Sequence, residues 1–153
     1  MSVYLVQHGK SLPKEKDPEK GLSEEGIAVA ERIASVAGGY HVHVTRIIHS
    51  GKKRAKQTAG IMASSLQPIE GIHEGHGLGP MDDIVPIADT LDGKSNHMFV
   101  GHLPFMSRLA SYLITGSTER PVFKFQNGGI LCLDENPESN SWIIRWSLMP
   151  DIS

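Results

Sequence analysis

The sequence is short of cysteine, of aromatic residues and of long apolar runs. Its one cysteine, Cys132, cannot form an internal disulfide, and its apolar neighbours predict a buried and inert thiol. No apolar run approaches the roughly 20 residues of a membrane-spanning helix. The first residues also lack the basic and then apolar pattern of a secretory signal. These absences predict a cytoplasmic protein with no membrane partner.

Neither sign of charge is in large excess. The formal net charge is -2, so we expect no nucleic-acid partner, and any site for an anion must be local. The histidine pairs His41/His43 and His73/His76 each lack a convincing third and fourth ligand. We therefore expect neither a bound metal nor another cofactor.

Length and composition predict one folded domain. Of the 153 residues, 39% are hydrophobic and 21% are charged, which is ordinary for a globular protein. A chain of this length buries about two-thirds of its unfolded surface when it folds. We expect a single domain over residues 1–153.

Strand patterns and helix patterns alternate along most of the chain. Apolar runs typical of buried strands lie at residues 3–6, 46–49 and 97–100. Each run leads towards a helical pattern, the first through a polar loop over residues 10–21 that we expect to be mobile, and a further helix is expected within residues 82–91. The later strand-like runs are residues 122–125, 130–133 and 142–148. This order predicts an α/β fold with a mostly parallel central sheet, helices on both faces and antiparallel strands at the C-terminal end.

Polar residues follow three of the predicted parallel strands. They are Gln7-His8, His49-Ser50 and Gly101-His102. Because ligands bind at the carboxyl ends of such strands, we expect these side chains to share one cleft. Residues 52–54 are basic and open a predicted helix, whose free N–H groups favour an anion. The pattern indicates a site for a group such as phosphate.

Four segments, in order, resemble the histidine phosphatase superfamily. Gln7-His8-Gly9 resembles its Arg-His-Gly signature, and Gly21-Leu-Ser-Glu-Glu-Gly26 resembles its Leu-Thr-x-x-Gly helix start. Residues 50–58 resemble Ser-Pro-x-x-Arg-Ala-x-Gln-Thr, and residues 101–104 resemble the segment of its second histidine. The C-terminal strands are similar to those of SixA-type phosphohistidine phosphatases.

The resemblance implies a metal-independent phosphatase in which His8 attacks phosphorus and becomes transiently phosphorylated. The ring of His8 would be neutral and oriented by a hydrogen bond from its other nitrogen to a backbone carbonyl. Arg54 and His102 would bind the phosphoryl oxygens, and Asp82 or Asp83 is the candidate general acid. The remaining substrate-binding residues would be Gln7, Gly9, Lys10, Ser50 and Leu103. The substrate would be a phosphohistidine protein, or else a small phosphorylated molecule.

Gln7 departs from the family pattern because the family has arginine there. An amide carries no charge, and losing one preorganised donor typically costs about 3–4 kcal/mol of transition-state stabilisation. Lys10, Lys52 or Lys53 are candidates to restore the charge. Two alternatives follow: a phospho-ligand binding module without turnover, and a phosphatase of small phosphoesters.

Overall fold

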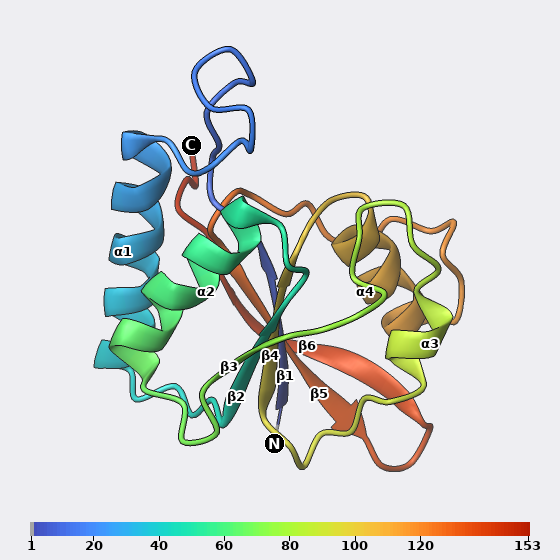
Figure 1. The fold of residues 1–153 in the computed structure, drawn as a ribbon. Helices are drawn as coiled ribbons and strands as arrows, with labels where there is room; N and C mark the ends of the chain where they lie inside the picture. The colour runs from blue at the N-terminus through green and yellow to red at the C-terminus, as the bar shows by residue number, and fades with distance from the viewer. Residues whose placement is uncertain (1) are drawn as a thin grey trace.

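The computed structural model describes residues 2–153, which form a six-stranded sheet in the order β3-β2-β4-β1-β5-β6 (Figure 1). The strands are β1 (Ser2–Gln7), β2 (Arg46–His49), β3 (Ile72–Glu74), β4 (His97–Gly101), β5 (Ile130–Asn136) and β6 (Ser141–Leu148). β1 to β4 pair in parallel, whereas β5 pairs antiparallel with both β1 and β6. The predicted α/β class, with antiparallel strands at the C-terminal end, is confirmed.

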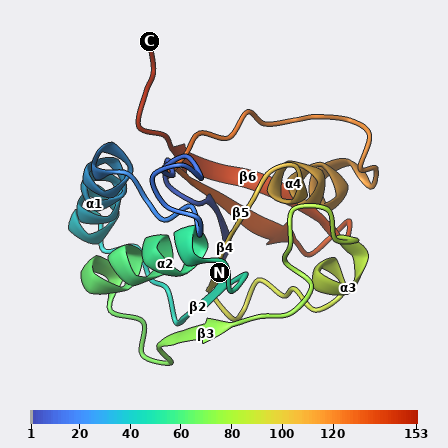
Figure 2. The ribbon, with the colours of Figure 1, turned by 45° about the horizontal axis from the view of Figure 1, so that its top comes forward.

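Four helices cover the two faces of this sheet. They are α1 (Glu24–Gly39), α2 (Lys53–Leu66), α3 (Val85–Ala88) and α4 (Phe105–Thr115). Figure 2 shows α1 and α2 on one face and α3 and α4 on the other. Successive residues of β1 point to opposite faces, so Tyr4 and Val6 pack under α1 and α2 while Val3 and Leu5 pack under α4. Burial on both faces explains why β1 is apolar throughout.

Local chemistry fixes the start of α1 where the sequence predicts it. The Ser23 hydroxyl accepts a hydrogen bond from the Gly26 N–H at 3.0 Å, and Glu24 and Glu25 lie in the first turn. A side-chain cap and acidic residues both satisfy the positive end of a helix. This helix end sits beside the segment that follows β1.

Two predicted elements differ from the structure, and one strand of the structure was not predicted. Residues 122–125 form no strand, although Phe125 is buried in the core and its ring contacts that of Phe123. The helix expected within residues 82–91 is only Val85–Ala88. β3 was not predicted, because its three residues are exposed at the sheet edge and show no apolar alternation.

None of the helices among residues 2–153 has the length and apolarity required to cross a bilayer.

Candidate active site

His8 lies at the carboxyl end of β1, and its backbone is held on both sides. Its N–H donates to the Gly101 carbonyl at 2.9 Å, and its own carbonyl accepts from the side-chain amide of Asn127 at 2.9 Å. Gly128, which follows Asn127, donates its N–H to the carbonyl of Gln7 at 2.9 Å. The turn at residues 127–128 therefore fixes the main chain that carries His8.

The ring of His8 has one nitrogen engaged by the backbone and one facing a cation. Nδ1 lies 2.7 Å from the Gly9 carbonyl oxygen, which can only accept, so Nδ1 carries the proton. Arg54 Nε donates to Nε2 at 3.3 Å, which requires a lone pair on that atom. The expected orienting hydrogen bond to a backbone carbonyl is thus present. Nε2 is the free, nucleophilic nitrogen.

His8 is held in its neutral form. Burial lowers the pKa of His8, and the nearby charges of Arg54 and Lys20 lower it further, against the opposing effect of the hydrogen bond to Gly9. Removing an imidazolium from water costs free energy, and a neighbouring cation adds repulsion. A neutral imidazole near pH 7 is the state that a nucleophile needs.

The first turns of α2 connect Arg54 to the backbone after His8. The Thr58 hydroxyl donates to the Arg54 carbonyl at 2.8 Å and accepts from the Gly9 N–H at 2.9 Å. The residue before it, Gln57, accepts a hydrogen bond from the Leu22 N–H through its side-chain oxygen at 2.7 Å. Gln57 and Thr58, the Gln-Thr pair of the sequence motif, therefore hold the main chain at Leu22 and Gly9 in place. The sequence alone did not assign this role.

His102 follows β4 and lies beside His8. The two ring centroids are 5.0 Å apart, and His102 is only 1% exposed. Its Nε2 is 2.6 Å from the Ser50 hydroxyl. This contact brings together the polar residues that follow β2 and β4. Burial, and then the proximity of His8, Arg54 and Lys52, lower the pKa of His102 to about 3. His102 is therefore a neutral partner.

His49, the residue before Ser50, is also buried. Its Nδ1 accepts a hydrogen bond from the Gly51 N–H at 3.0 Å. This contact holds the turn that leads into α2. His49 is therefore a packed residue that supports the site from behind Ser50.

Gln7 occupies the position where the sequence signature expects arginine. It ends β1, directly before His8, and its Cα pairs with Gly101, directly before His102. Its side-chain oxygen is buried and has no hydrogen-bond partner among residues 2–153.

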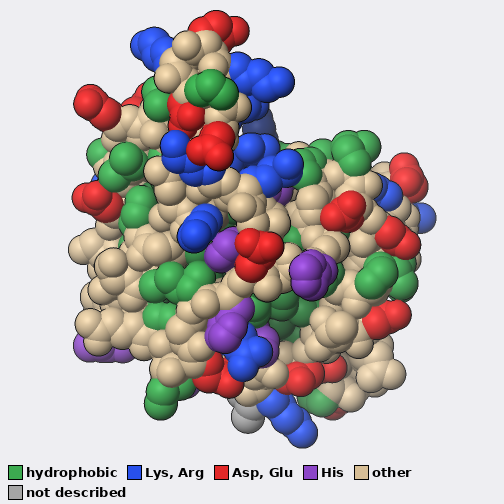
Figure 3. Space-filling model, in the orientation of Figure 1, with side chains coloured by type: hydrophobic (Ala, Val, Ile, Leu, Met, Phe, Trp, Pro, Cys, Tyr) green, Lys and Arg blue, Asp and Glu red, His purple; other side chains and the backbone are tan. Residues whose placement is uncertain are grey.

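The candidate lysines are not equivalent. Lys10 forms an exposed ion pair of 2.8 Å with Glu25, and Lys53 forms one of 2.8 Å with Asp17. Besides Arg54, the charge of Lys20 lowers the pKa of His8 and the charge of Lys52 lowers that of His102. Figure 3 shows Lys and Arg side chains gathered where the loop after β1 meets the body of the molecule. Lys10 is thus directed to α1, whereas Lys20 lies within electrostatic reach of His8.

The loop over residues 8–22 is tied to the helices at several points. Besides the Asp17–Lys53 ion pair, Ser11 and Leu22 form an antiparallel bridge, and the Ser23 N–H donates to the Lys10 carbonyl at 2.9 Å. A Cβ atom on Gly26 would overlap the Lys10 carbonyl. The glycine of the Leu-Ser-Glu-Glu-Gly segment is therefore required by this close approach.

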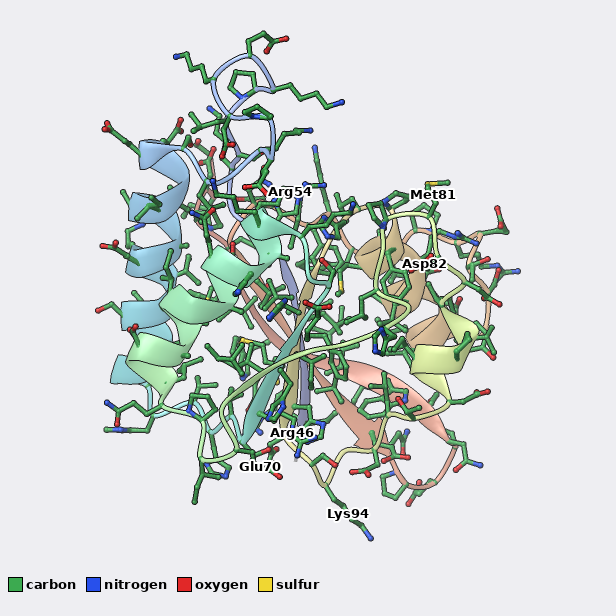
Figure 4. The ribbon with its side chains drawn as sticks, in the orientation of Figure 1. Arg46, Arg54, Glu70, Met81, Asp82 and Lys94 are labelled. Carbon is green, nitrogen blue, oxygen red and sulfur yellow. The ribbon has the colours of Figure 1, made fainter. Side chains whose placement is uncertain are left out.

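Asp82 and Leu103 lie at the margin of the cluster. Asp82 is exposed, and its carboxylate accepts from the Gly79 N–H at 2.7 Å; no hydrogen bond joins it to His8, Arg54 or His102 within residues 2–153. Figure 4 places Asp82 on the loop before α3, across the molecule's upper end from Arg54 at the start of α2. Leu103 is 38% exposed beside His102. Asp83 caps its own turn through the Val85 N–H.

The described residues do not gather the ligand set of a metal site: no group of three His, Cys, Asp or Glu side chains that could hold an ion occurs in residues 2–153. Asn127, which the sequence analysis did not single out, holds the backbone of His8. The only local signal is an amide before two glycines, Gly128 and Gly129, a pattern typical of a turn.

Comparisons with known proteins agree with this geometry. The family model of the histidine phosphatase superfamily (branch 1) matches residues 3–78. No curated protein matches the chain by sequence. The fold is similar to that of the protein histidine phosphatase SixA complexed with tungstate, with a TM-score of 0.83 and 24% identity over 98% of this chain and 97% of that chain.

Two further solved structures share the fold. A putative phosphohistidine phosphatase SixA from Agrobacterium tumefaciens has a TM-score of 0.77 and 24% identity, over 97% of both chains. A mycobacterial glucosyl-3-phosphoglycerate phosphatase in complex with VO3 has a TM-score of 0.70 and 13% identity, over 97% of this chain and 99% of that chain. At these identities the likeness establishes a common fold.

Proposed function

The chain belongs to the histidine phosphatase superfamily, and we propose that within it this protein is a phosphohistidine phosphatase that acts through a covalent phosphohistidine at His8. The observation that carries the proposal is the state of the His8 ring. Nδ1 is committed to the Gly9 carbonyl, and the lone pair of Nε2 faces the guanidinium of Arg54. A nucleophile and the cation that would hold its target are thus adjacent.

In the proposed reaction, Nε2 of His8 attacks phosphorus and the bond to the leaving atom breaks. Water then hydrolyses the phosphorylated His8 and releases phosphate. Arg54 would bind two phosphoryl oxygens and stabilise the charge that spreads over them in the transition state. Neutral His102, 5.0 Å from His8 between ring centroids, would donate a further hydrogen bond. No step in this scheme requires a metal.

A phosphorylated protein is the proposed substrate. Leu103 is exposed directly after His102, so a side chain carried on another protein can approach this end of the site. Two of the similar folds carry the name SixA, one of them as a putative phosphohistidine phosphatase. A phosphohistidine has an imidazole leaving group that a proton makes neutral, so it needs less help from an acid than an alkoxide does.

A small phosphoester is the second candidate substrate. The glucosyl-3-phosphoglycerate phosphatase of the same fold supports it. An alkoxide leaving group requires a general acid, and Asp82 is the candidate for that role. Gln7 supports a third candidate, a module that binds a phosphorylated ligand without turnover, because the site lacks the charge of the family arginine.

The test is phosphate release, without added metal and with a chelator present, from a phosphohistidine-bearing protein and from p-nitrophenyl phosphate. Wild type, His8→Ala and Gln7→Arg are compared, with His73→Ala as the control because His73 is exposed on β3, away from His8. Release from the phosphoprotein that disappears only in His8→Ala supports the proposal. Release from the ester alone favours the second candidate, and binding of phosphate without release from either substrate favours the third.

A further inference from the structure

The residues that follow β6 lie against the turn that holds His8. β5 and β6 pair antiparallel, and Ile130 faces Leu148 where this pairing ends. Residues 126–129, which precede β5, and residues 149–151, which follow β6, therefore lie side by side beyond the paired strands. Figure 1 shows the C-terminal end of the chain at the same end of the molecule as the loop that follows β1. The 149–151 segment thus reaches the end of the sheet that carries the candidate active site.

Gln126 joins this segment to the turn through two hydrogen bonds. Its side-chain nitrogen donates to the Asp151 carbonyl at 2.6 Å, and its side-chain oxygen accepts from the Asp151 N–H at 2.9 Å. The main chain of Asp151 offers one acceptor and one donor, so it fixes which way the amide of Gln126 points. The side chain of Gln126 therefore pairs with residue 151 much as the main chain of a neighbouring strand would.

Two further contacts hold the segment in place. The guanidinium of Arg32, on α1, donates to the Pro150 carbonyl at 2.9 Å. A Cβ atom on Gly129 would overlap the side chain of Met149, so the turn and the segment approach as closely as a glycine allows. The 149–151 segment is therefore anchored both to α1 and to the turn before β5.

The same turn fixes the main chain of the candidate nucleophile. The side-chain amide of Asn127 donates to the His8 carbonyl, and the Gly128 N–H donates to the Gln7 carbonyl, both at 2.9 Å. Gln126 is the residue directly before Asn127. A displacement of Gln126 would thus be passed on to both contacts with residues 7 and 8.

We infer that the 149–151 segment is a clamp that positions His8, acting through Gln126 and the turn at residues 127–128. The inference rests on the proposed function for the role of His8 and goes beyond it by adding positioning residues outside the site. A reactive group displaced by about 1 Å can lose about 100-fold in rate. The hydrogen bonds of the clamp are exposed, and each adds only modestly to stability. Loss of the clamp should therefore affect catalysis more than folding.

The first experiment compares Gln126→Met, which keeps the length of the side chain without the amide, with Gln67→Met as the matched control. Gln67 is exposed and follows the end of α2, whereas Arg54 lies at its start. With the phosphohistidine protein as substrate, kcat should fall about tenfold to 100-fold in Gln126→Met. KM should stay close to that of the wild type, because the proposed phosphoryl-binding residues Arg54 and His102 are unchanged. Gln67→Met should keep both wild-type values.

A second pair of variants tests whether the main chain of Asp151 is the part that acts. Asp151→Pro removes the N–H that donates to Gln126, and Asp151→Ala keeps it. Asp151→Pro should lower kcat as Gln126→Met does. Asp151→Ala should keep the wild-type kcat, although it removes the carboxylate that accepts from the Ser153 N–H. Equal losses in the proline and alanine variants would assign the effect to the carboxylate and overturn the clamp.

Amide hydrogen exchange gives a readout that does not depend on turnover. Because the Gly128 N–H donates to the Gln7 carbonyl, its exchange should be about fivefold to tenfold faster in Gln126→Met, the effect of losing about one net hydrogen bond. The amides of α4 should exchange as in the wild type.

A wild-type kcat in both Gln126→Met and Asp151→Pro overturns the inference, as does a loss confined to KM. A lower kcat in Gln126→Met with an unchanged exchange rate at Gly128 also overturns it, because the turn has then not moved. If the wild type itself releases no phosphate, the proposed function fails and the exchange rates alone decide. Faster exchange at Gly128 in Gln126→Met then keeps the clamp, and an unchanged rate overturns it.

Discussion

Arg54 Nε and His8 Nε2 are 3.3 Å apart, and the hydrogen bond runs from the guanidinium to the only nitrogen of that ring with a free lone pair. The contact favours the unprotonated form of His8, the proposed nucleophile, and places a cation where the phosphoryl oxygens would arrive. Binding of the substrate would exchange this hydrogen bond for contacts between Arg54 and the phosphoryl group. One residue therefore serves both the resting state and the proposed transition state.

Arg54→Lys is expected to lower kcat by about 100-fold to 1,000-fold, the effect of losing one preorganised donor in the transition state. Lysine keeps the charge, so KM should change much less than kcat, but it cannot bind two oxygens with a planar fork. Steady-state kinetics with the phosphohistidine protein provide the measurement.

Arg46→Lys is the matched control for this substitution. Arg46 begins β2 at the opposite end of the sheet, pairs with Glu70 at 3.2 Å, and is separated from Arg54 in Figure 4. Its kinetics should follow the wild type. Equal losses in the two variants, or a loss in Arg54→Lys confined to KM, would remove Arg54 from the transition state.

Gly26→Ala is expected to destabilise the protein, because the new Cβ would overlap the Lys10 carbonyl and force the loop after His8 away from α1. A forced shift in a packed region typically costs about 1–3 kcal/mol. Urea denaturation measures the free energy of unfolding. Gly60→Ala is the control within a helix, since nothing lies within 4 Å of its Cβ, and it should stabilise the protein by about 0.4–1 kcal/mol. A Gly26→Ala protein as stable as the wild type contradicts the required close approach.

The parts of the fold that the sequence predicts well are those with a strong local signal. The apolar run of β1 and the capped start of α1 were both placed correctly, because burial on two faces and a serine cap leave clear patterns. β3 was missed, since an exposed edge strand is specified by its pairing with β2 and not by its own residues. The apolar residues around Phe123 and Phe125 predicted a strand. In the structure their side chains pack against each other, but their backbone does not pair with any strand of the sheet.

The candidate site likewise contains residues that local motifs predict and residues whose roles depend on tertiary contacts. The order of motifs along the chain predicted that His8, Arg54 and His102 would meet, and the structure brings them together. The role of Asn127 depends on a contact with His8 across 119 positions in sequence, which no local pattern encodes. The partners of the lysines were likewise set by tertiary structure, because Lys20 acts on His8 while Lys10 turns to Glu25.

Thr58→Val is expected to reduce stability by about 1–3 kcal/mol, because it leaves the buried Gly9 N–H without an acceptor. It should also lower kcat, since the Gly9 carbonyl orients the ring of His8. Thr58→Ser keeps the hydroxyl and loses only a methyl group, so its cost should stay near 0.8 kcal/mol, about that of one buried methylene, with kcat preserved. Urea denaturation of both variants measures the change in stability, and steady-state kinetics measure the change in kcat. Similar behaviour of the valine and serine variants would show that packing, and not the hydrogen bond, makes Thr58 necessary.

The pH dependence of kcat/KM should report the lowered pKa of His8. Protonated His8 has no lone pair on Nε2, so the rate falls as the pH drops through this pKa. Because burial and the neighbouring cations lower the pKa, the acid limb should lie below the ordinary histidine value of about 6.5. A pH–rate profile on a phosphohistidine protein measures it, and Arg54→Gln, which removes a cation, should move the limb to higher pH. An acid limb above pH 6.5 in the wild type would mean that the surroundings of His8 raise its pKa and do not lower it.

The stability of the protein should fall on acidification because His102 is buried in its neutral form. Its pKa is about 3 in the folded state and about 6.5 in an unfolded chain, so between these values the unfolded state binds more protons. Stability from this group is therefore complete above about pH 6.5 and declines as the pH falls towards 3, with a slope of up to about 1.4 kcal/mol per pH unit. His102→Gln removes the titrating ring, so its free energy of unfolding, measured in urea at successive pH values, should depend less on pH in this window than that of the wild type. His73→Gln removes an exposed histidine instead and should keep the wild-type slope. An unchanged slope in His102→Gln would mean that His102 is protonated as readily in the folded protein as in the unfolded chain.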